Sequence, residues 1–257
     1  MILSPVKHIP LIKPGDLLPN IILEALVKND IILMDGDILV IAQKIVSKSE
    51  GRLFNLSEVI PSDKALALAE EVQKDARLVE LILAESKNII RRRKGTLIVE
   101  HRNGFICANA GIDHSNVKGP YGKPEDWVLL LPEDADRSAQ KIREQVGILS
   151  HKNVGILIID SHGRPWRLGI IGTAIGLAGI PALLDMRGRE DLFGFRLKIT
   201  QEAVADELAA AASLLMGQSG EKIPVVHVRD FPYTGLPQSE HDCMKDMLRP
   251  EQDDLFR

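Results

Sequence analysis

The sequence predicts an α+β fold, in which strands and helices follow one another without regular alternation. Three observations support this. Short apolar runs typical of buried strands stand between helical patterns, and an Asn-Gly turn marks an antiparallel hairpin. Neither a G-x-x-x-x-G-K-[ST] nor a G-x-G-x-x-G motif is present, so neither a P-loop nor a Rossmann cofactor unit is supported. We therefore expect mixed sheets rather than a doubly wound parallel sheet.

The first third of the chain predicts one extended segment, one buried strand and three helices. Residues 6–12 are expected to be extended, and the turn Pro14-Gly15-Asp16 precedes a helix near residues 17–27. Asp35-Gly36-Asp37 is a second turn, and the apolar residues 38–42 after it predict a buried strand. Pro61 and Ser62 open a helix with apolar residues at helical spacing, and a further helix is expected over residues 76–86. The apolar positions of the former are Leu66, Ala69, Val72 and Ala76.

The rest of the chain begins with the hairpin. Residues 96–100 and 105–109 flank Arg102-Asn103-Gly104, and a short strand is expected at 128–131. A helix begins at Asp136, and a buried strand at 156–159 ends at Asp160. An alanine-rich helix over 202–216 is closed by Gly217, a last strand covers 224–228, and residues 239–257 are expected to be a flexible polar tail.

Composition excludes several classes of protein. A net charge of -4 argues against general affinity for nucleic acid, because such affinity needs a basic surface. Two cysteines are too few for a disulfide framework and suit a reducing cytosol. The apolar run over residues 168–184 falls short of the ~20 residues that a bilayer span needs, so we interpret it as buried backbone and expect no membrane partner. No linker divides the 257 residues, which we expect to form one unit.

Two segments carry residues suited to phosphate. The segment 42–52, AQKIVSKSEGR, follows a buried strand, and its lysines could reach phosphate oxygens as point charges. The alternative is a solvated strand end. The segment 216–223, MGQSGEKI, is glycine-rich, so its backbone could approach phosphates closely. The alternative is an ordinary helix C-cap at Gly217 followed by a connector.

Two further segments carry oxygen ligands. Asp113 lies in NAGIDHSN at the end of the hairpin, and Asp160 and Ser161 follow an apolar strand. Such oxygens suit Mg²⁺ or Mn²⁺, whereas either aspartate alone is more often a turn or helix cap. Two carboxylates that converge repel each other unless one is protonated or a cation lies between them. We interpret the histidines without ligand spacing as structural or surface residues; these are His8, His101, His151 and His227.

At these four segments the sequence resembles the coenzyme F-420-0:L-glutamate ligase family. The strings AQKIVSKSEGR, FICANAGIDHSNV, DSHGRPWRLG with AIGLAG, and TQEAVADELAAAASLLMGQ match the family's motifs in the same order. The resemblance covers nearly the whole chain, including the closing DLFR. It implies a single catalytic unit over residues 1–257 with a distinctive two-lobed α+β fold and an intertwined homodimer. Some relatives carry a fused nitroreductase-like domain after the ligase; this chain ends at Arg257, so we do not expect that second activity.

The resemblance also implies site residues. Asp113 and Asp160 would hold one divalent ion, Mn²⁺ or Mg²⁺, and Ser161 and Gln218 a second, with potassium as a further candidate ion. Some relatives carry Glu where this chain has Gln218, so a neutral and weaker ligand stands there. The implied GTP site comprises Ile9, Pro10, Leu11, Ile12, Gln43, Lys44, Lys48, Asn116, Met216, Gly217, Gln218, Ser219, Gly220, Glu221, Lys222 and Ile223.

The implied activity is cytoplasmic ligation of L-glutamate to F-420-0. GTP would phosphorylate a carboxylate to an acyl phosphate, which the glutamate amine then attacks, and one or more glutamates would be added. Lys44, Arg164 and Arg167 are our own candidates for holding substrate carboxylates or the phosphodiester of F-420-0. The alternatives are an amide ligase for a different acidic acceptor and a nucleotide-binding module without catalysis.

Overall fold

A computed structural model describes residues 1–233 and 243–255 of the chain. The strands are β1 (Ile2–Val6), β2 (Ile38–Ala42), β3 (Leu53–Asn55), β4 (Ser86–Arg93), β5 (Thr96–His101), β6 (Ile106–Ala108), β7 (Trp127–Leu129), β8 (Gly155–Arg164), β9 (Arg167–Ala178), β10 (Leu184–Asp185), β11 (Gln201–Glu202) and β12 (Val225–Arg229). The α-helices are α1 (Leu18–Lys28), α2 (Gln43–Ser49), α3 (Asp63–Val72), α4 (Ala76–Ala84), α5 (Ala135–Ser150) and α6 (Val204–Met216). Helices and strands are mixed without regular alternation, which confirms the predicted α+β class.

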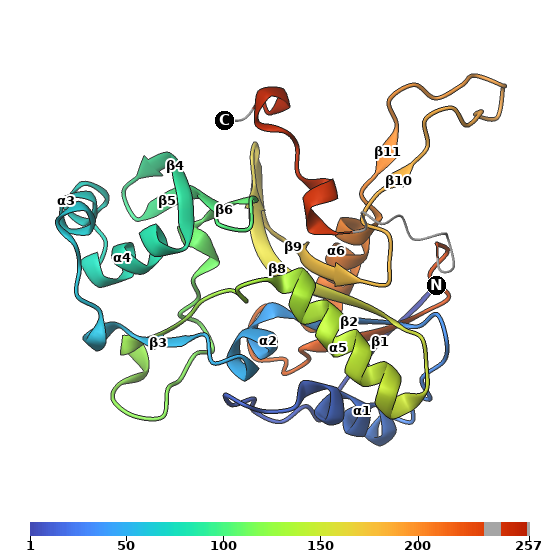
Figure 1. Ribbon diagram of the computed structural model, residues 1–257, viewed down its shortest axis with the longest axis horizontal. Coiled ribbons are helices and arrows are strands. Elements are labelled where there is room, and N and C mark those ends of the chain that lie inside the picture. The colour runs from blue at the N-terminus through green and yellow to red at the C-terminus, as the bar shows by residue number, and fades with distance from the viewer. Residues whose placement is uncertain (234–242, 256–257) are drawn as a thin grey trace.

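A five-stranded sheet forms the centre of the main lobe, in the order β1-β12-β2-β8-β9. Only β2 and β8 are parallel, with Ile38 opposite Gly155, and the other neighbours are antiparallel. Both faces of the sheet are covered. Leu39 and Ile41 belong to the hydrophobic cluster that contains α1 and α5, whereas Ile38 and Val40 belong to the cluster that contains α6. This explains why β2 is a continuous apolar run rather than an alternating one. Figure 1 shows α5 and α6 on opposite sides of this sheet.

A second lobe is inserted between α2 and α5. It contains the helices α3 and α4 and the sheet β4-β5-β6, and a two-stranded sheet of β3 and β7 connects it to the main lobe (Figure 1). Its apolar residues Ile82 and Leu97 belong to the same hydrophobic cluster as Ile158 of β8, so the core is continuous between the lobes. Ser62 caps α3 and the Asn103-Gly104 turn lies between β5 and β6, with Gly104 at a φ of 101°, as predicted.

A buried cluster of charges lies at the junction of the two lobes. The Arg52 guanidinium donates to the Glu85 carboxylate at 2.8 Å and to the Leu131 carbonyl at 2.9 Å. Arg102 donates to the other oxygen of Glu85 at 3.0 Å, and His101 Nε2 lies 3.6 Å from Glu85. Burial disfavours the charged form of Glu85, but His101 and Arg52 outweigh it and lower the pKa of this carboxyl. The charges are therefore compensated within the junction.

Some predicted elements are wrong in their limits. Residues 6–12 were expected to be extended, but the strand is Ile2–Val6 and residues 7–17 form no helix or strand. The strand expected to end at Asp160 continues to Arg164. The run 168–184, expected to be buried, is buried only in part. Most of it forms the antiparallel strand β9, whose first residues are exposed, with Leu168 at 98%, whereas residues 174–178 of β9 are buried. β3 and β4 were not predicted, because β4 is mostly polar and β3 is only three residues long.

The glycines of β9 allow close helix packing. A Cβ at Gly172 would lie 2.5 Å from the Ala209 carbonyl oxygen of α6, and one at Gly176 would lie 2.4 Å from Ala135 of α5. The glycines in this apolar run therefore serve contact with helices on both faces of the sheet.

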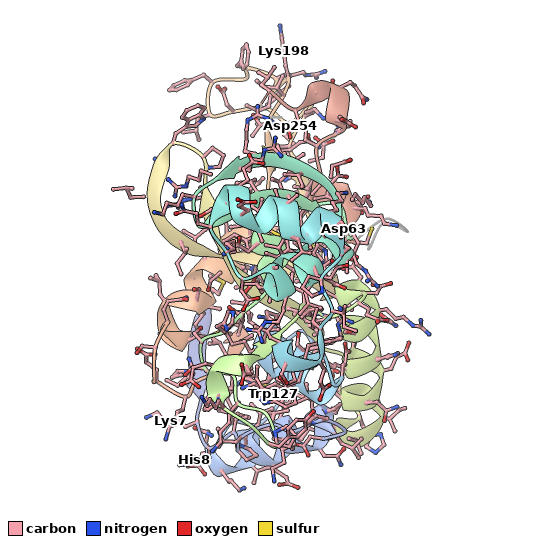
Figure 2. The ribbon with its side chains drawn as sticks, turned by 90° about the vertical axis from the view of Figure 1, so that its left-hand side faces the viewer. Lys7, His8, Asp63, Trp127, Lys198 and Asp254 are labelled. Atoms are coloured by element: carbon pink, nitrogen blue, oxygen red, sulfur yellow. The ribbon has the colours of Figure 1, made fainter. Side chains whose placement is uncertain are left out.

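An extended arm projects from the main lobe. It lies between β10 and β11, and its side chains Leu192 and Phe193 are 96% and 94% exposed (Figure 1). Figure 2 shows Lys198 of the arm and Asp254 near one end of the molecule, and Lys7 and His8 near the other.

The C-terminal segment that was expected to be a flexible tail is described in part. Met244 is buried against the α6 side of the sheet, and its backbone N–H donates to Asp136 of α5 at 3.0 Å. Short 3-10 helices occur at Met244–Met247 and Glu251–Asp253. Residues 239–242 and 256–257 lie outside the described residues, and the flexibility of this segment stays a prediction. Within the described residues, no helix combines the length and apolarity needed to cross a membrane.

Candidate functional site

The lysines of the first polar segment lie on a helix. Residues 43–49 had been expected to leave β2 as a strand end, but they form α2 directly after it. Lys44 and Lys48 are consequently one turn apart and lie on the same side of that helix. Gln43 is almost fully buried, and its side-chain oxygen accepts from the Ser47 hydroxyl at 2.9 Å. The sequence did not indicate this helix, because no capping side chain marks its start.

α2 and the loop after β6 are joined by hydrogen bonds to a single carboxylate. The Gln43 amide donates to Asp113 Oδ2 at 2.7 Å, and Lys44 Nζ lies 3.1 Å from the same oxygen. Lys44 also donates to the Ser115 carbonyl at 2.9 Å and hydroxyl at 3.0 Å. Lys48 Nζ donates to the Asn116 carbonyl at 2.8 Å. The first two polar segments therefore form one cluster, and both lysines face it.

The electrostatics of this cluster link Asp113 to Asp160. Burial raises the pKa of Asp113, Lys44 acts in the opposite direction, and the charge of Asp160 raises it again, so that the net shift is upward. Burial and Asp160 also raise the pKa of the Cys107 thiol to about 12. For Lys48, burial and the neighbouring Lys44 lower the ammonium pKa. The negative charge of Asp160 thus disfavours ionisation of Asp113, and a nearby cation such as Lys44 favours it.

Asp160 and Ser161 lie on β8 with their side chains on opposite faces of the sheet. The Ser161 hydroxyl donates to Gln218 Oε1 at 2.9 Å, and the Gln218 amide donates to the Ser213 hydroxyl of α6 at 3.1 Å. Asp160 Oδ2 lies 3.0 Å from His162 Nε2. The structure therefore joins the third polar segment to the fourth through the pair of Ser161 and Gln218.

The fourth segment follows the C-terminus of α6. Gly217 is its C-cap, with a φ of 71°, and its N–H donates to the Ser213 carbonyl. The Ser219 N–H donates to the Glu221 carboxylate at 2.8 Å, and the Ser219 carbonyl accepts from the Asn116 amide at 3.0 Å. Residues 218–222 are otherwise exposed or half-buried, whereas the Met216 side chain packs in the core. The loop is therefore tied to the Asp113 segment through Asn116.

Two sets of predicted residues lie outside these hydrogen bonds. Residues 9–12 belong to the loop before α1, where Leu11 is 86% exposed and Ile12 is buried. Within the part of the chain that the structure describes, no hydrogen bond joins them to the cluster; the loop approaches α2 through Gly15, whose N–H donates to the Ser49 carbonyl. Arg164 and Arg167 lie opposite each other at the tip of the β8–β9 hairpin. The Arg164 Nε atom is buried without a partner.

Sequence reasoning missed His162, Ser115 and Ser213, all of which contact predicted residues. A signal existed for His162, because residues two apart on a strand share a face, so a strand extended past Asp160 places the two side chains together. Ser115 could not be found from spacing, because its contact with Lys44 joins segments 71 residues apart. Ser213 is only five residues before Gln218, but the two meet because the chain turns at Gly217 after α6, which the residue pattern alone does not specify.

The residues present fit divalent cations that take part of their coordination from a substrate. Among the described residues, no group of three or more His, Cys, Asp or Glu side chains is arranged to hold a metal. Asp113 and Asp160 are nevertheless two mutually repelling carboxylates, and Ser161 and Gln218 supply neutral oxygens 2.9 Å apart. Magnesium characteristically uses one or two carboxylates together with substrate phosphates and water. The donor set is of this kind.

Comparison with known proteins gives the family. The sequence profile described as F420-0:Gamma-glutamyl ligase matches residues 7–230. The coenzyme F420:L-glutamate ligase of Methanothermobacter thermautotrophicus is 44% identical over 252 residues, which cover 98% of this chain and 97% of the relative. The ligase of the same name from Archaeoglobus fulgidus is 41% identical over 253 residues, which cover 98% of this chain and 95% of the relative. The one from Methanopyrus kandleri is 45% identical over 227 residues, which cover 87% of this chain and 86% of the relative. The chain belongs to the F420-0:gamma-glutamyl ligase family, as its four motifs had indicated.

Proposed function

We propose that this protein is a GTP- and metal-dependent ligase that joins L-glutamate to coenzyme F-420-0 through an acyl phosphate. The relatives bear the name coenzyme F420:L-glutamate ligase. The observation that carries the proposal is the convergence of four polar segments. Gln43 and Lys44 contact Asp113, Asn116 contacts the glycine-rich loop at Ser219, and Ser161 contacts Gln218.

Two divalent ions, manganese or magnesium, fit the oxygen donors, and potassium remains a further candidate. Asp113 and Asp160 would hold one ion, and Ser161 and Gln218 the other. When bound, such ions neutralise the charge of a transferring phosphoryl group. Asp113 would then bind its ion as a carboxylate, because the positive charge favours the ionised form over the raised pKa that burial imposes.

The chain's own cations would position the nucleotide. Lys44 and Lys48 donate to loop carbonyls in this structure, and both would transfer these hydrogen bonds to the more negative oxygens of GTP. The loop Met216 to Ile223 and residues 9–12 would complete the nucleotide site. Lys44 would in addition shield Asp113 before the ions arrive, since its ammonium lies 3.1 Å from that carboxylate.

The chemistry needs two displacements. A carboxylate oxygen of F-420-0 attacks the γ-phosphorus of GTP, the bond from that phosphorus to the bridging oxygen breaks, and GDP leaves. The glutamate amine then attacks the acyl carbon, loses a proton, and expels inorganic phosphate. Catalysis of such steps is mainly positioning and charge neutralisation, which lysines and bound cations supply. Arg164 and Arg167 would meet the anionic acceptor at the hairpin tip.

We propose that the enzyme works as a cytoplasmic homodimer with small-molecule substrates and without nucleic acid or membrane. The arm exposes Leu192, Phe193, Phe195 and Ile199, and the hairpin tip exposes Trp166 and Leu168. Apolar side chains gathered on projecting elements are typical of surfaces that bind protein. Both cysteines are free, which suits a reducing compartment.

The test is incubation of the protein with GTP, Mn²⁺, L-glutamate and F-420-0, followed by mass spectrometry. We expect products heavier by one or more glutamyl units and stoichiometric GDP and phosphate. Replacement of GTP by ATP, omission of Mn²⁺, and replacement of F-420-0 by other polycarboxylates are the controls. Ligation to another acceptor only would favour the alternative amide ligase, and nucleotide binding without any product would favour a non-catalytic module.

A further inference from the structure

His162 is a polar residue of the site to which the proposed mechanism gives no role. It stands two residues after Asp160 on β8, so both side chains extend from the same face of the strand. Its Nε2 atom lies 3.0 Å from Asp160 Oδ2, and each side chain is only 12% exposed. An ionised carboxylate can only accept, so the imidazole is the donor. Little water reaches this hydrogen bond to compete with it.

The imidazole of His162 is held in place from the second lobe. Its ring packs against Phe105 with centroids 5.5 Å apart at an angle of 42°. Phe105 is stacked in turn on His101, at 4.9 Å and 3°. His101 is fully buried and lies 3.6 Å from Glu85, which Arg52 and Arg102 hold at the junction of the lobes. The orientation of His162 is therefore set by groups that do not belong to the site.

We propose that His162 is a positioning residue for Asp160. Its Nε2–H fixes Oδ2, so the carboxylate keeps one orientation and Oδ1 is the oxygen that this hydrogen bond leaves for a divalent ion. Carboxylates that bind metals are characteristically oriented by such outer hydrogen bonds, and loss of one typically weakens metal affinity by roughly 10- to 100-fold. The inference rests on the metal role proposed above for Asp160.

A purely structural role for His162 predicts a different outcome. In that case the ring matters for packing against Phe105, and a phenylalanine at position 162 would preserve that packing while removing the donor. A glutamine would do the reverse, because its amide can donate to the carboxylate but offers no ring. The pair His162→Phe and His162→Gln therefore separates positioning from packing.

The experiment measures Mn²⁺ affinity on the full chain in the presence of a non-hydrolysable GTP analogue, from the electron paramagnetic resonance signal of free Mn²⁺ compared with that of the same analogue without protein. We expect His162→Phe to bind Mn²⁺ roughly 10-fold or more weakly, with a melting temperature near that of the wild type. We expect His162→Gln to remain within about threefold of the wild type, because a donor is retained. Asp160→Asn is the reference for loss of the ligand itself.

Each outcome decides the matter. If His162→Phe binds Mn²⁺ like the wild type, or if the glutamine variant is as weak as the phenylalanine variant, the positioning role is wrong. If Asp160→Asn loses Mn²⁺ while His162→Phe does not, the proposed metal role stands and only this inference falls. If the wild type itself binds no Mn²⁺, both fall together. His162→Leu is a second variant without a donor. If neither His162→Phe nor His162→Leu folds, His162 has a structural role instead.

Discussion

At the scale of single residues, the proposed metal ligand Asp160 allows the most direct test. Asp160→Asn keeps the shape of the side chain and removes its charge. We expect ligation to fall by roughly 10³-fold or more, because a cation that neutralises transferring phosphate contributes several kcal/mol to the barrier. Turnover at saturating Mn²⁺ is the measurement. Asp63→Asn, an exposed aspartate in the first turn of α3, is the control and should keep full activity. Activity of the Asp160 variant within tenfold of wild type would contradict its role as a ligand.

Lys48 offers a second test at this scale. We expect Lys48→Met to weaken GTP affinity by roughly 10- to 100-fold, because a hydrogen bond to a charged group contributes about 1.5–3 kcal/mol. The exposed Lys87 and Lys123 are matched controls, since surface substitutions usually change stability by less than about 0.5 kcal/mol. Calorimetric titration of all three methionine variants, at one salt and metal concentration, gives the comparison. If the Lys48 variant binds GTP like the controls, this lysine only ties α2 to the Asn116 carbonyl.

Among the elements, the connection after α6 depends on a glycine. Gly217 has a φ of 71°, and a Cβ there would lie 2.3 Å from the Glu221 side chain. Gly217→Val should therefore lower the melting temperature and weaken GTP binding, because both the backbone and the approach of the phosphates are disturbed. Gly95, in the turn between β4 and β5, also has a positive φ, of 76°, with open space around its Cα, so Gly95→Val is the control for a β-branched side chain at such a position outside the site.

Titrations of both variants with GTP and ATP complete this test. We expect the wild type to prefer GTP. Equal affinity of the wild type for the two nucleotides would contradict the nucleotide choice that the family resemblance implies. An unchanged GTP affinity in Gly217→Val would remove the loop from the nucleotide site.

The junction between the lobes gives a prediction about pH. The pKa of Glu85 is lowered in the folded state, so folding is favoured by this group above its unfolded pKa of about 4.3, and the contribution is lost as pH falls through the lower folded value. Glu85→Gln leaves Arg52 with the exposed Glu133 carboxylate, 3.2 Å away, as its anion, which should cost up to about 3–5 kcal/mol of unfolding free energy. Urea unfolding at neutral pH and near pH 3 measures both effects. Wild-type stability should decline more steeply with acid than that of the variant, and equal slopes would contradict this account.

Local sequence predicted most elements but not their lengths. The strand β2, the hairpin of β5 and β6, and the helix α6 follow from apolar periodicity and turn residues. The strand β8 was predicted too short, because its polar continuation from Asp160 to Arg164 is stabilised by pairing with β9 rather than by burial of its own side chains. α2 was missed because it is only seven residues long and no capping side chain marks its start. Its lysines are held by the loop after β6, 71 residues later for Lys44 and 68 for Lys48.

At the scale of the whole molecule, the candidate site residues could be selected from the sequence, but the contacts between them could not. The aspartates and lysines were selected because their type and their position after strands suggest metal and phosphate chemistry, and these roles stay predictions. Which pairs meet depends on the fold: Asp113 reaches α2 only because the second lobe returns its hairpin to the main sheet. His162 was missed because β8 was predicted to end at Asp160, and its contact with Phe105 of the other lobe depends on the fold.

The projecting arm provides a test of assembly. We expect the wild type to sediment as a dimer and the double variant Leu192→Ser, Phe193→Ser to dissociate at micromolar concentrations, because two large apolar side chains leave the interface. Ile60→Ser is the control, since Ile60 is 89% exposed but lies before α3 on the second lobe. Analytical ultracentrifugation of the three proteins decides it. A dimer unaffected by the double variant would place the interface elsewhere.

The position of β12 has a consequence for how the chain is made. This strand lies between β1 and β2, although it is the last of the three to leave the ribosome. Until Val225–Arg229 emerges, the nascent chain presents β1 without a partner and the apolar β2 with an open edge, which is a template for pairing with other chains. Translation at about 5–20 residues per second keeps that edge open for on the order of ten seconds. A protein truncated before Val225 should therefore aggregate. In stalled ribosome complexes, the nascent chain should become resistant to protease only once β12 has left the exit tunnel.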